Sequence, residues 1–170
     1  RSVYFGLEVG GQLAGGLQLV LPDERGTFPC QNVWPEVAVE DPSRCVHVSI
    51  MALEEQYRGQ SALFWLLAAE MWRYCVGEGI GCLFIEVTPR VLPIYQRMGW
   101  PLVIQGEKRL HWGEDCYLCA MEVPEVTSEL VRRSSRSMSY RAVAAQAFRL
   151  QEEPEEYWAI IDPPKLRLAA

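Results

Sequence analysis

Short apolar runs, separated by polar and Gly-containing turns, recur from residue 3 to residue 123 and predict β-strands. The predicted strands cover residues 3–9, 12–21, 45–53, 82–87, 101–104 and 116–123. Gly10 and Gly11 suit a tight turn between the first two strands, which we therefore expect to pair as a hairpin. The third run is apolar on both faces except at His47 and Ser49, which favours a central position in the sheet.

Two helices are expected among these strands. The longer one, at residues 61–76, is apolar nearly all round except at Glu70 and Arg73, so it must be largely buried. The shorter one covers residues 90–98. Residues 22–44 contain Pro, Asp and Gly without sustained periodicity, which predicts a long loop of the kind that is usually functional or mobile.

The predicted order is a hairpin, a strand, a helix, a strand, a helix and two more strands. Strands and helices are mixed without strict alternation, which favours a mixed α/β sheet over a doubly wound parallel one. Leu110, His111 and Trp112 fall in the connection between the last two strands. From Pro124 onward the chain is helical and polar and then rich in Glu and Pro, which is typical of a peripheral tail.

Composition narrows the class of protein. The chain has 170 residues, 49% of them hydrophobic, which suits one globular domain with a full-sized core. A net charge of −6 argues against a general nucleic-acid binder. Basic residues nevertheless cluster at Arg90, Arg97, Lys108, Arg109, Arg132, Arg133, Arg136 and Arg141. Such clusters suit an anionic partner, although a solvated surface is the commoner explanation.

Most of the six cysteines lie inside apolar runs, as small buried hydrophobic residues do. Because the chain has two histidines and a single CxxC motif, Cys116–Cys119, which lies in a predicted strand, we expect no zinc or other metal site. These features favour a reduced, cytoplasmic protein. The longest apolar run, residues 62–69, is too short to span a bilayer. The chain begins at Arg1 inside an apparent strand, so we expect that further residues precede it.

The stretch from the third strand into the long helix offers a possible anion site. Ser61 is a candidate N-cap, and the polar turn at residues 54–60 leads into the helix N-terminus. Free amides at the positive end of a helix dipole attract anions. An ordinary strand-to-helix connection would have the same local pattern.

Two motifs in this context resemble those of Gcn5-related N-acyltransferases. Residues 56–61 (QYRGQS) resemble the Gln/Arg-x-x-Gly-x-Gly/Ala signature, with Ser61 in the last small position. Residues 95–100 (YQRMGW) resemble the Tyr-x-x-x-Gly-aromatic element. Residues 79–123, together with the loop that starts at Leu21, are similar to acyl-homoserine-lactone synthases and the related N-acyl amino acid synthases. The resemblance covers residues 3–131.

This resemblance implies an acyl-CoA N-acyltransferase fold, in which helices flank a central, mostly antiparallel sheet with two splayed parallel strands. The implied function is transfer of a fatty acyl group from an acyl carrier protein, or from acyl-CoA, to the amine of a small amino-acid-like acceptor. The product would be an N-acyl amino acid or an N-acyl-homoserine lactone. An acetyl-CoA-dependent N-acetyltransferase and a non-catalytic acyl-binding protein of the same fold are the alternatives.

The resemblance also assigns the donor site. The phosphopantetheine arm of the donor would lie between the strands at residues 45–53 and 82–87, and no other cofactor is implied. The donor-binding residues would be Leu53, Arg58, Gly59, Gln60, Ser61 and Ala62. Their amides would receive the phosphate groups of the donor, Arg58 could add a charge-assisted bond, and Gly59 would let the backbone approach closely.

Four residues are candidates for catalysis. Glu86 lies in an apolar strand, and a desolvated carboxylate holds a proton tightly enough to serve as a base, although it could instead pair with an arginine. Tyr95 would donate to the leaving thiolate, with plain packing as the alternative. Asp41 and Arg44 would orient the acceptor together with Ser43, or would simply form a turn.

The last candidates concern pockets. Phe28, Trp34, Ser49 and Phe84 could line the acyl or acceptor pocket, although most aromatics in such positions belong to the core. His47 and His111 rank lower as bases, because a lone histidine in a strand is more often structural.

The chain departs from the synthase pattern at one motif. The synthases carry Glu-x-Ser-Arg before the central strand, whereas residues 41–44 read Asp-Pro-Ser-Arg here, so the acidic role falls to Asp41 or Glu40. We expect an acyltransferase domain at residues 1–131, lacking its N-terminal helices, and a peripheral helical extension at residues 132–170.

Overall fold

The structure is a computed structural model that describes residues 1–134, 136–137, 140–141 and 166–169. It divides the chain into two compact units. The first unit comprises Arg1–Val3, Leu19–Ser49 and Gly79–Glu129, and the second comprises Tyr4–Gln18, Ile50–Glu78 and Leu130–Ala170. Strands β2 (Gln12–Val20) and β3 (Cys45–Leu53) contribute residues to both units.

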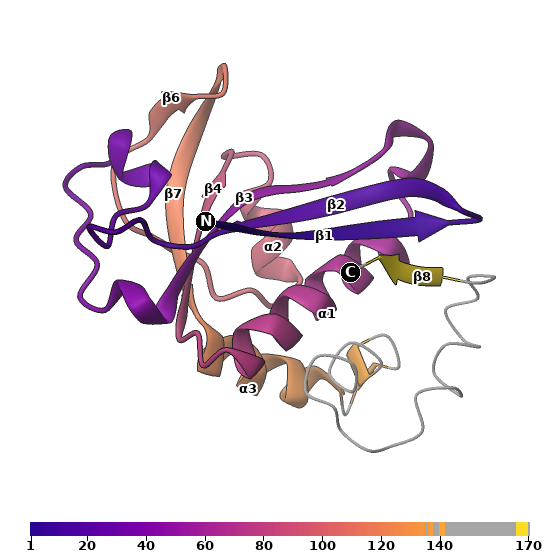
Figure 1. Cartoon of the computed structure of the whole chain (residues 1–170). Coiled ribbons are helices and arrows are strands. Elements are labelled where there is room, and N and C mark those ends of the chain that lie inside the picture. Colours follow the sequence, from indigo (N-terminus) through magenta and orange to yellow (C-terminus); the bar gives the residue numbers. More distant parts are fainter. Residues whose placement is uncertain (135, 138–139, 142–165, 170) are drawn as a thin grey trace. The chain divides into compact units, whose positions relative to one another are not determined.

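The first unit is built on a sheet. Its strands, besides β3, are β4 (Cys82–Val87), β5 (Val103–Ile104), β6 (Arg109–His111) and β7 (Glu114–Glu122). They follow the order β5–β7–β4–β3, and β6 also pairs with β7 (Figure 1). The β3–β4 pair is parallel, whereas β7 is antiparallel to β4, β5 and β6. The predicted mixed, mostly antiparallel sheet is therefore confirmed.

The two parallel strands stop pairing before they end. Their ladder runs from Cys45–Cys82 to Val48–Ile85, although β3 continues to Leu53 and β4 to Val87. The last two residues of β4 remain paired with β7. This is the separation that the fold class predicts for its splayed central strands.

A hydrophobic cluster joins this sheet to the long loop at residues 21–44. The buried members are Phe28, Cys30, Trp34, Val37, Cys45, Phe84, Cys116 and Leu118. The loop contains two short 3₁₀ helices, η1 (Pro29–Asn32) and η2 (Pro42–Arg44), and is otherwise irregular, as predicted. Trp34 anchors it by donating from Nε1 to the carbonyl oxygen of Glu107 over 2.8 Å.

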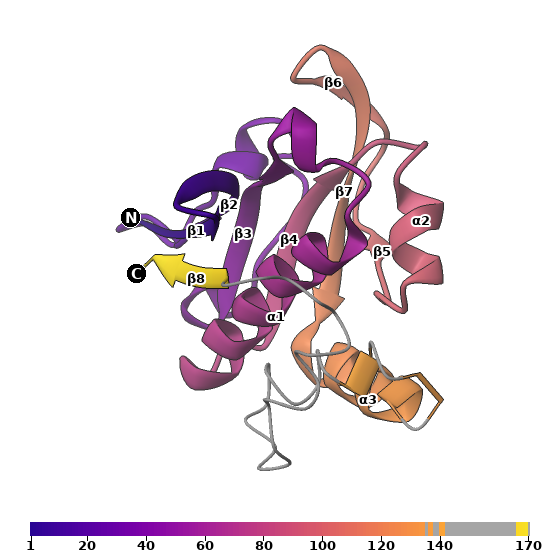
Figure 2. The same ribbon diagram turned by 90° about the vertical axis from the view of Figure 1, so that its right-hand side faces the viewer.

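The expectation that residues 110–112 form a plain connection was wrong. Residues 109–111 form β6, a hairpin partner of β7 (Figure 2). Trp112 (φ 54°) and Gly113 (φ 81°) occupy the turn, and two consecutive positive φ angles match the twist that two-residue hairpins require. A tryptophan in the first of these positions is unusual, which is why the sequence did not suggest a hairpin here.

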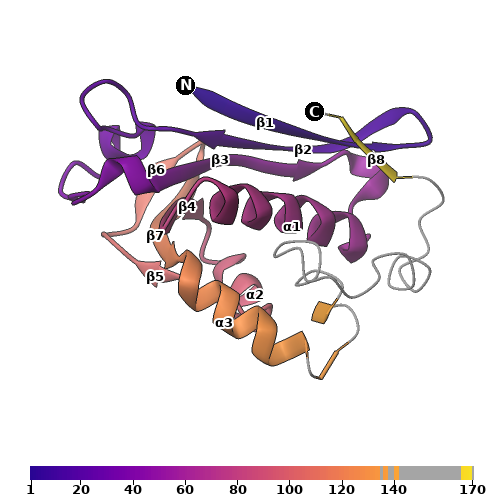
Figure 3. The same cartoon turned by 60° about the horizontal axis from the view of Figure 1, so that its bottom comes forward.

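Two helices follow the sheet strands. Helix α2 (Leu92–Arg97) is shorter than predicted, because the amides of Val91 and Leu92 both donate to the carbonyl oxygen of Thr88 and close a turn. Strand β7 runs directly into α3 (Val123–Ser134), so the strand ends one residue earlier than predicted (Figure 3).

The second unit contains most of the hairpin of β1 (Ser2–Val9) and β2, together with η3 (Glu55–Tyr57) and α1 (Ser61–Gly77). Nine of the 17 residues of α1 are buried, which confirms the prediction of a largely buried helix. Phe5 of β1 meets Tyr74 of α1 edge to face, with ring centroids 5.8 Å apart. Strand β8 (Leu166–Ala169), which was not predicted, pairs with β1.

The prediction that Ser61 caps α1 was wrong by one residue. Gln60 is the N-cap, with no capping bond from its side chain, and Ser61 is the first helical residue. The main chain at Gln60 (φ −83°, ψ 86°) is not yet helical, and its carbonyl oxygen accepts from the amide of Leu63. Within the described residues, neither α1 nor any other helix is long and apolar enough to cross a membrane.

Candidate active site

One face of the first unit's sheet carries the polar residues that interrupt its apolar strands. His47 of β3 is in register with Phe84 of β4. Because side chains alternate between the two faces of a strand, Glu86 lies on the same face as His47. Ser49, half-buried, follows on this face of β3. The register therefore brings together polar residues that are 39 positions apart in the sequence.

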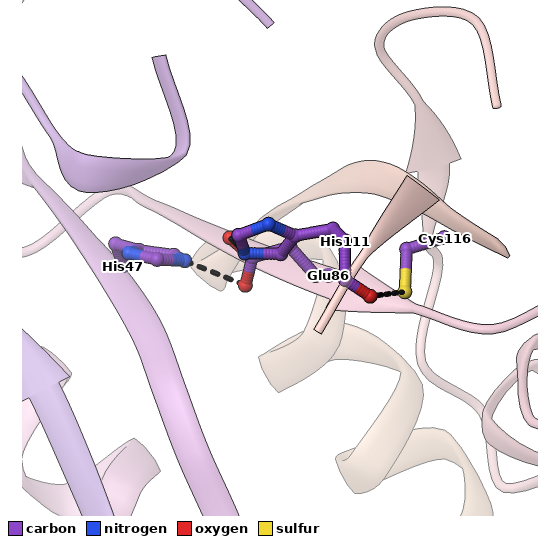
Figure 4. Close-up of polar contacts among 4 residues, drawn as sticks. All are labelled: His47, Glu86, His111 and Cys116. Atoms are coloured by element: carbon purple, nitrogen blue, oxygen red, sulfur yellow. Dashed lines mark hydrogen bonds and ion pairs between the residues drawn. The ribbon is translucent and has the colours of Figure 1, made fainter. Parts of the chain in front are cut away.

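Glu86 is held between two histidines. Nε2 of His47 lies 2.7 Å from Oε2 of Glu86, and Nε2 of His111 lies 3.9 Å from Oε1 (Figure 4). The exposed fractions of the side chains are 7% for Glu86, 3% for His47 and 21% for His111. The expectation of a desolvated carboxylate agrees with this burial, and the partners are histidines rather than an arginine.

The second ring nitrogen of His47 has an unmet hydrogen-bonding capacity. Nδ1 is buried and has no partner among the residues that the structure describes. When Nε2 carries the proton and donates to Glu86, Nδ1 is an acceptor that a water molecule or a substrate N–H can satisfy. A carboxylate bonded to an imidazole in this way can act as a base, and the proton that it accepts makes the pair neutral overall.

His111 is positioned by the hairpin and by the loop. Its ring meets Trp34 edge to face at 5.8 Å and Trp112 at 4.9 Å. Its carbonyl oxygen accepts from Sγ of Cys116 over 3.7 Å, across the β6–β7 hairpin (Figure 4). Sequence reasoning ranked both histidines low, because a lone histidine in a strand is more often structural. The available signal was that His47 and Glu86 interrupt two neighbouring apolar strands.

The aromatic residues that were predicted to line a pocket lie close together, but they belong mostly to the packed hydrophobic core. Phe28 and Trp34 are 3% and 0% exposed and belong to the hydrophobic cluster. The rings of Phe28 and Phe84 are 5.9 Å apart. Of these three aromatic residues, only Phe84 also lines a cavity.

That cavity lies where β3 and β4 begin and β7 ends, and its volume is about 430 Å³. Its lining comprises Ala38, Val39, Glu40, Asp41, Arg44, Cys45, Gly81, Cys82, Phe84, Gln105, Ala120, Glu122 and Pro124. Two candidates for orienting an acceptor, Asp41 and Arg44, therefore share one cavity with the alternative acid Glu40. Glu86 follows Phe84 by two residues on the same face, which separates their Cα atoms by about 7 Å.

The polar groups at the cavity mouth are held by local bonds. The hydroxyl of Ser43 donates to Oδ1 of Asp41 over 2.5 Å, and Nε of Arg44 donates to the carbonyl oxygen of Gly79 over 3.3 Å. Gly81 makes room for this guanidinium, because a Cβ there would lie 3.2 Å from a terminal nitrogen of Arg44. The mouth thus presents a carboxylate and a guanidinium, the pair that complements a free amino acid.

Tyr95 lies in α2 and does not line this cavity. Its ring packs on that of Trp100 with centroids 4.8 Å apart. Burial raises the pKa of Tyr95, so its phenol keeps its proton and can act as a donor. Across the described part of the chain, no group of three or more His, Cys, Asp or Glu side chains is placed to hold a metal ion.

The candidate donor loop belongs to the second unit. Nε of Arg58 donates to the carbonyl oxygen of Leu53 over 3.3 Å, which ties the loop to the end of β3. The amides of Arg58 and Gln60 donate within the turn. Among the described residues, the amides of Gly59, Ser61 and Ala62 have no hydrogen-bond acceptor. Gly59 has φ 88°, and no atom lies within 4 Å of the position its Cβ would take.

Comparisons with known proteins identify the family and the fold. The family model described as N-acyl amino acid synthase FeeM matches residues 1–122. Among curated proteins, a search found no match to the sequence. A solved structure of BjaI, a CoA-dependent acyl-homoserine lactone synthase with SAM and isopentyl-CoA, superposes with a TM-score of 0.63 at 18% identity. That match covers 80% of this chain and 66% of BjaI, so the chain spans slightly less than two thirds of that relative.

Two further solved structures are similar. FeeM, an N-acyl amino acid synthase from uncultured soil microbes, gives a TM-score of 0.60 at 18% identity, covering 75% of this chain and 71% of FeeM. The acyl-homoserine lactone synthase LasI gives 0.59 at 19% identity, covering 71% of this chain and 64% of LasI. At these identities the likenesses establish the fold.

Proposed function

Because the chain belongs to the N-acyl amino acid synthase FeeM family of acyltransferases, we propose that it moves a fatty acyl group onto the amine of an amino-acid-like acceptor. The donor is a phosphopantetheine thioester, carried by an acyl carrier protein or by coenzyme A, and the product is an N-acyl amino acid. The observation that carries the proposal, beyond family membership, is the buried Glu86 carboxylate with its two histidine partners. A buried carboxylate with such partners is suited to general-base catalysis.

Each step of the reaction has a candidate group. Glu86 takes a proton from the acceptor's ammonium, and the resulting amine attacks the thioester carbonyl carbon. The new C–N bond forms, the C–S bond breaks, and the thiolate leaves with a proton from Tyr95. The attacking nitrogen loses its second proton, and the Tyr95 phenolate regains one, through solvent. The raised pKa of Tyr95 supports its role as the proton donor, since the phenol stays protonated until a stronger base appears.

The acceptor has a candidate site in the 430 Å³ cavity. Arg44 presents a guanidinium, which binds a carboxylate with favourable geometry, and Asp41 or Glu40 presents an anion for the ammonium. Phe84 lines this cavity, and Glu86 follows it by two residues on the same face of β4.

The donor has a candidate site in the loop of the second unit. The amides of Gly59, Ser61 and Ala62 stand at the N-terminus of the 17-residue helix α1, where the helix dipole favours a phosphate. The open space beside Gly59 leaves the backbone accessible. Arg58 is positioned by Leu53 and adds positive charge beside these amides.

Mass spectrometry of the lipids made on expression tests the proposal. Cells that express the protein should accumulate N-acyl amino acids, and cells that express Glu86→Gln should not. Acylated homoserine lactones would instead identify S-adenosylmethionine as the acceptor, and N-acetylated amines would identify acetyl-CoA as the donor. If the folded protein forms no acylated amine from acyl-carrier protein or acyl-CoA with any amino acid, the proposal is wrong.

A further inference from the structure

Two cysteines face each other on the parallel strands of the first unit. Cys45, the first residue of β3, is in register with Cys82, the first residue of β4, and their side chains point to the same face. Sγ of Cys45 donates to the carbonyl oxygen of Asp41 over 3.3 Å, and Sγ of Cys82 donates to that of Leu83 over 3.8 Å. Both thiols line the 430 Å³ cavity, Cys45 beside its sequence neighbour Arg44.

This arrangement is compatible with a covalent bridge. Neighbouring strands lie about 4.8 Å apart, and disulfide-bonded cysteines have Cα atoms about 4.4 to 6.8 Å apart. Cys116 and Cys119 of β7, by contrast, are three positions apart on one strand, so their side chains point to opposite faces. All six cysteines are free in the structure.

Cys45 also differs from the other cysteines in the direction of its pKa shift. The neighbouring thiol of Cys82 lowers the pKa of Cys45, with the positive charge of Arg44 as a smaller contribution. The neighbouring Cys45, together with burial, raises the pKa of Cys82. Burial raises the pKa of Cys30 and Cys75 to about 12, so those thiols remain protonated and inert. The lowered pKa of Cys45 and its place beside Arg44 in the cavity make it the candidate attacking residue, with Cys82 as the candidate resolving thiol.

We propose that Cys45 and Cys82 form a dithiol modification site in the cavity, which small-molecule disulfides oxidise to a bridge between β3 and β4. The Cys45 thiolate attacks one sulfur of the small disulfide, which forms a mixed disulfide and releases one thiolate. Cys82 then loses its proton and attacks Sγ of Cys45, which forms the bridge and releases the second thiolate. Two cysteine thiols are thus oxidised by two electrons, and the small disulfide is reduced to two thiols.

The bridge has a consequence for the proposed acceptor site, and this part of the inference depends on the proposed function. Cys45 follows Arg44 directly and lies in the same cavity wall. A mixed disulfide would occupy the cavity, and the bridge would fix the wall beside the guanidinium. Oxidation should therefore raise the KM for the acceptor several-fold while leaving the KM for the donor nearly unchanged.

Peptide mapping of the wild-type protein tests the site without any activity measurement. The reduced protein is incubated with oxidised glutathione at neutral pH, alkylated, and cleaved after Arg and Glu. Cleavage after Glu78 separates Cys75 from Cys82. We expect a Cys45–Cys82 linked peptide that dithiothreitol abolishes, with Cys30 and Cys75 recovered as alkylated thiols. Recovery of Cys45 and Cys82 as free thiols, or bridging through other pairs, would overturn the proposal.

Variants test the order of the two steps. Cys82→Ser should stop at the Cys45–glutathione mixed disulfide, because the resolving thiol is missing. Cys45→Ser should slow glutathionylation of Cys82 at least tenfold, because its raised pKa leaves little thiolate. Cys30→Ser is the control and should form the bridge at the wild-type rate. Equal reaction rates in Cys45→Ser and the wild type would contradict the assignment of Cys45 as the attacking residue.

Discussion

Nε2 of His47 lies 2.7 Å from Oε2 of Glu86, a contact between neighbouring parallel strands in which both side chains are almost fully buried. Since the burial of a charged group is costly unless it is paired, this pair is either a structural polar contact or the base of the reaction. The two roles predict different mutant phenotypes.

We expect Glu86→Gln to lower kcat about 10² to 10⁴-fold, the range that general-base catalysis usually contributes. Glutamine keeps the shape of the side chain and can still accept from His47, so the unfolding midpoint should move little. Steady-state kinetics and thermal unfolding measure the two effects. Glu114→Gln, an exposed substitution at the start of β7, is the control. A variant that is destabilised but retains its turnover per folded molecule would indicate the purely structural role.

The donor loop can be tested with matched glycine substitutions. Gly59→Ala places a Cβ at φ 88° and should cost about 1 to 2 kcal/mol of stability through backbone strain. Gly79→Ala, at φ 69° and also with open space around its Cβ, should cost a similar amount. Only Gly59→Ala should also raise the KM for the acyl donor, by tenfold or more. Equal donor KM values in the two variants would show that the loop does not bind the donor.

Tyr95→Phe tests whether Tyr95 acts as a proton donor or only as a packing residue. The ring that packs on Trp100 is kept, so stability near neutral pH should change by less than about 1 kcal/mol, whereas kcat should fall about 10²-fold. Tyr4→Phe, at an exposed tyrosine, is the control and should keep full activity. Unchanged turnover in Tyr95→Phe would assign this tyrosine to packing alone.

The same variant has a defined pH signature. Because the pKa of Tyr95 is raised above its ordinary value of 10.0, its stabilising contribution is complete below about pH 10 and is lost as pH rises through the folded-state pKa. Wild-type stability should therefore fall more steeply than that of Tyr95→Phe as the pH rises above about 10. Thermal unfolding across this range measures the difference, and parallel curves would contradict it.

Docking of an acidic carrier protein predicts a salt effect. Arg97 of α2 and Arg90, two residues before the helix, are exposed basic residues. Charge reversal of both to Glu should raise the KM for acyl-carrier protein several-fold and spare acyl-CoA. The difference should vanish at about 1 M salt, where the Debye length is about 3 Å. Arg25→Glu, in the exposed loop, is the control. Equal losses with both donors would indicate damaged packing.

Local sequence was sufficient for the strands that form the centre of the first unit. The bounds of β3 and β4 agree with the prediction, because each is an apolar run delimited by polar or Gly-containing turns. Strand β6 escaped prediction because it has three residues and enters its turn at Trp112 rather than at Asn or Asp.

The site was predictable only in part. Glu86 stands out as a charge in an apolar strand, and residues 41–44 stand out through the motif that they resemble. The contacts of Glu86 with His47 and His111, and of Cys45 with Cys82, depend on which residues of two strands face each other. Register is set by the whole sheet and its turns, and no local pattern specifies it.

The anchoring of the long loop has a consequence for how the chain acquires its structure during synthesis. Trp34 donates to the carbonyl oxygen of Glu107, and the guanidinium of Arg109 donates to that of Val33, across separations of 73 and 76 residues. Synthesis adds about 5 to 20 residues per second, so the loop must wait several seconds on the ribosome for its anchors. The wall that this loop contributes to the cavity is therefore among the last parts of the first unit to form, because contacts this distant in sequence close slowly.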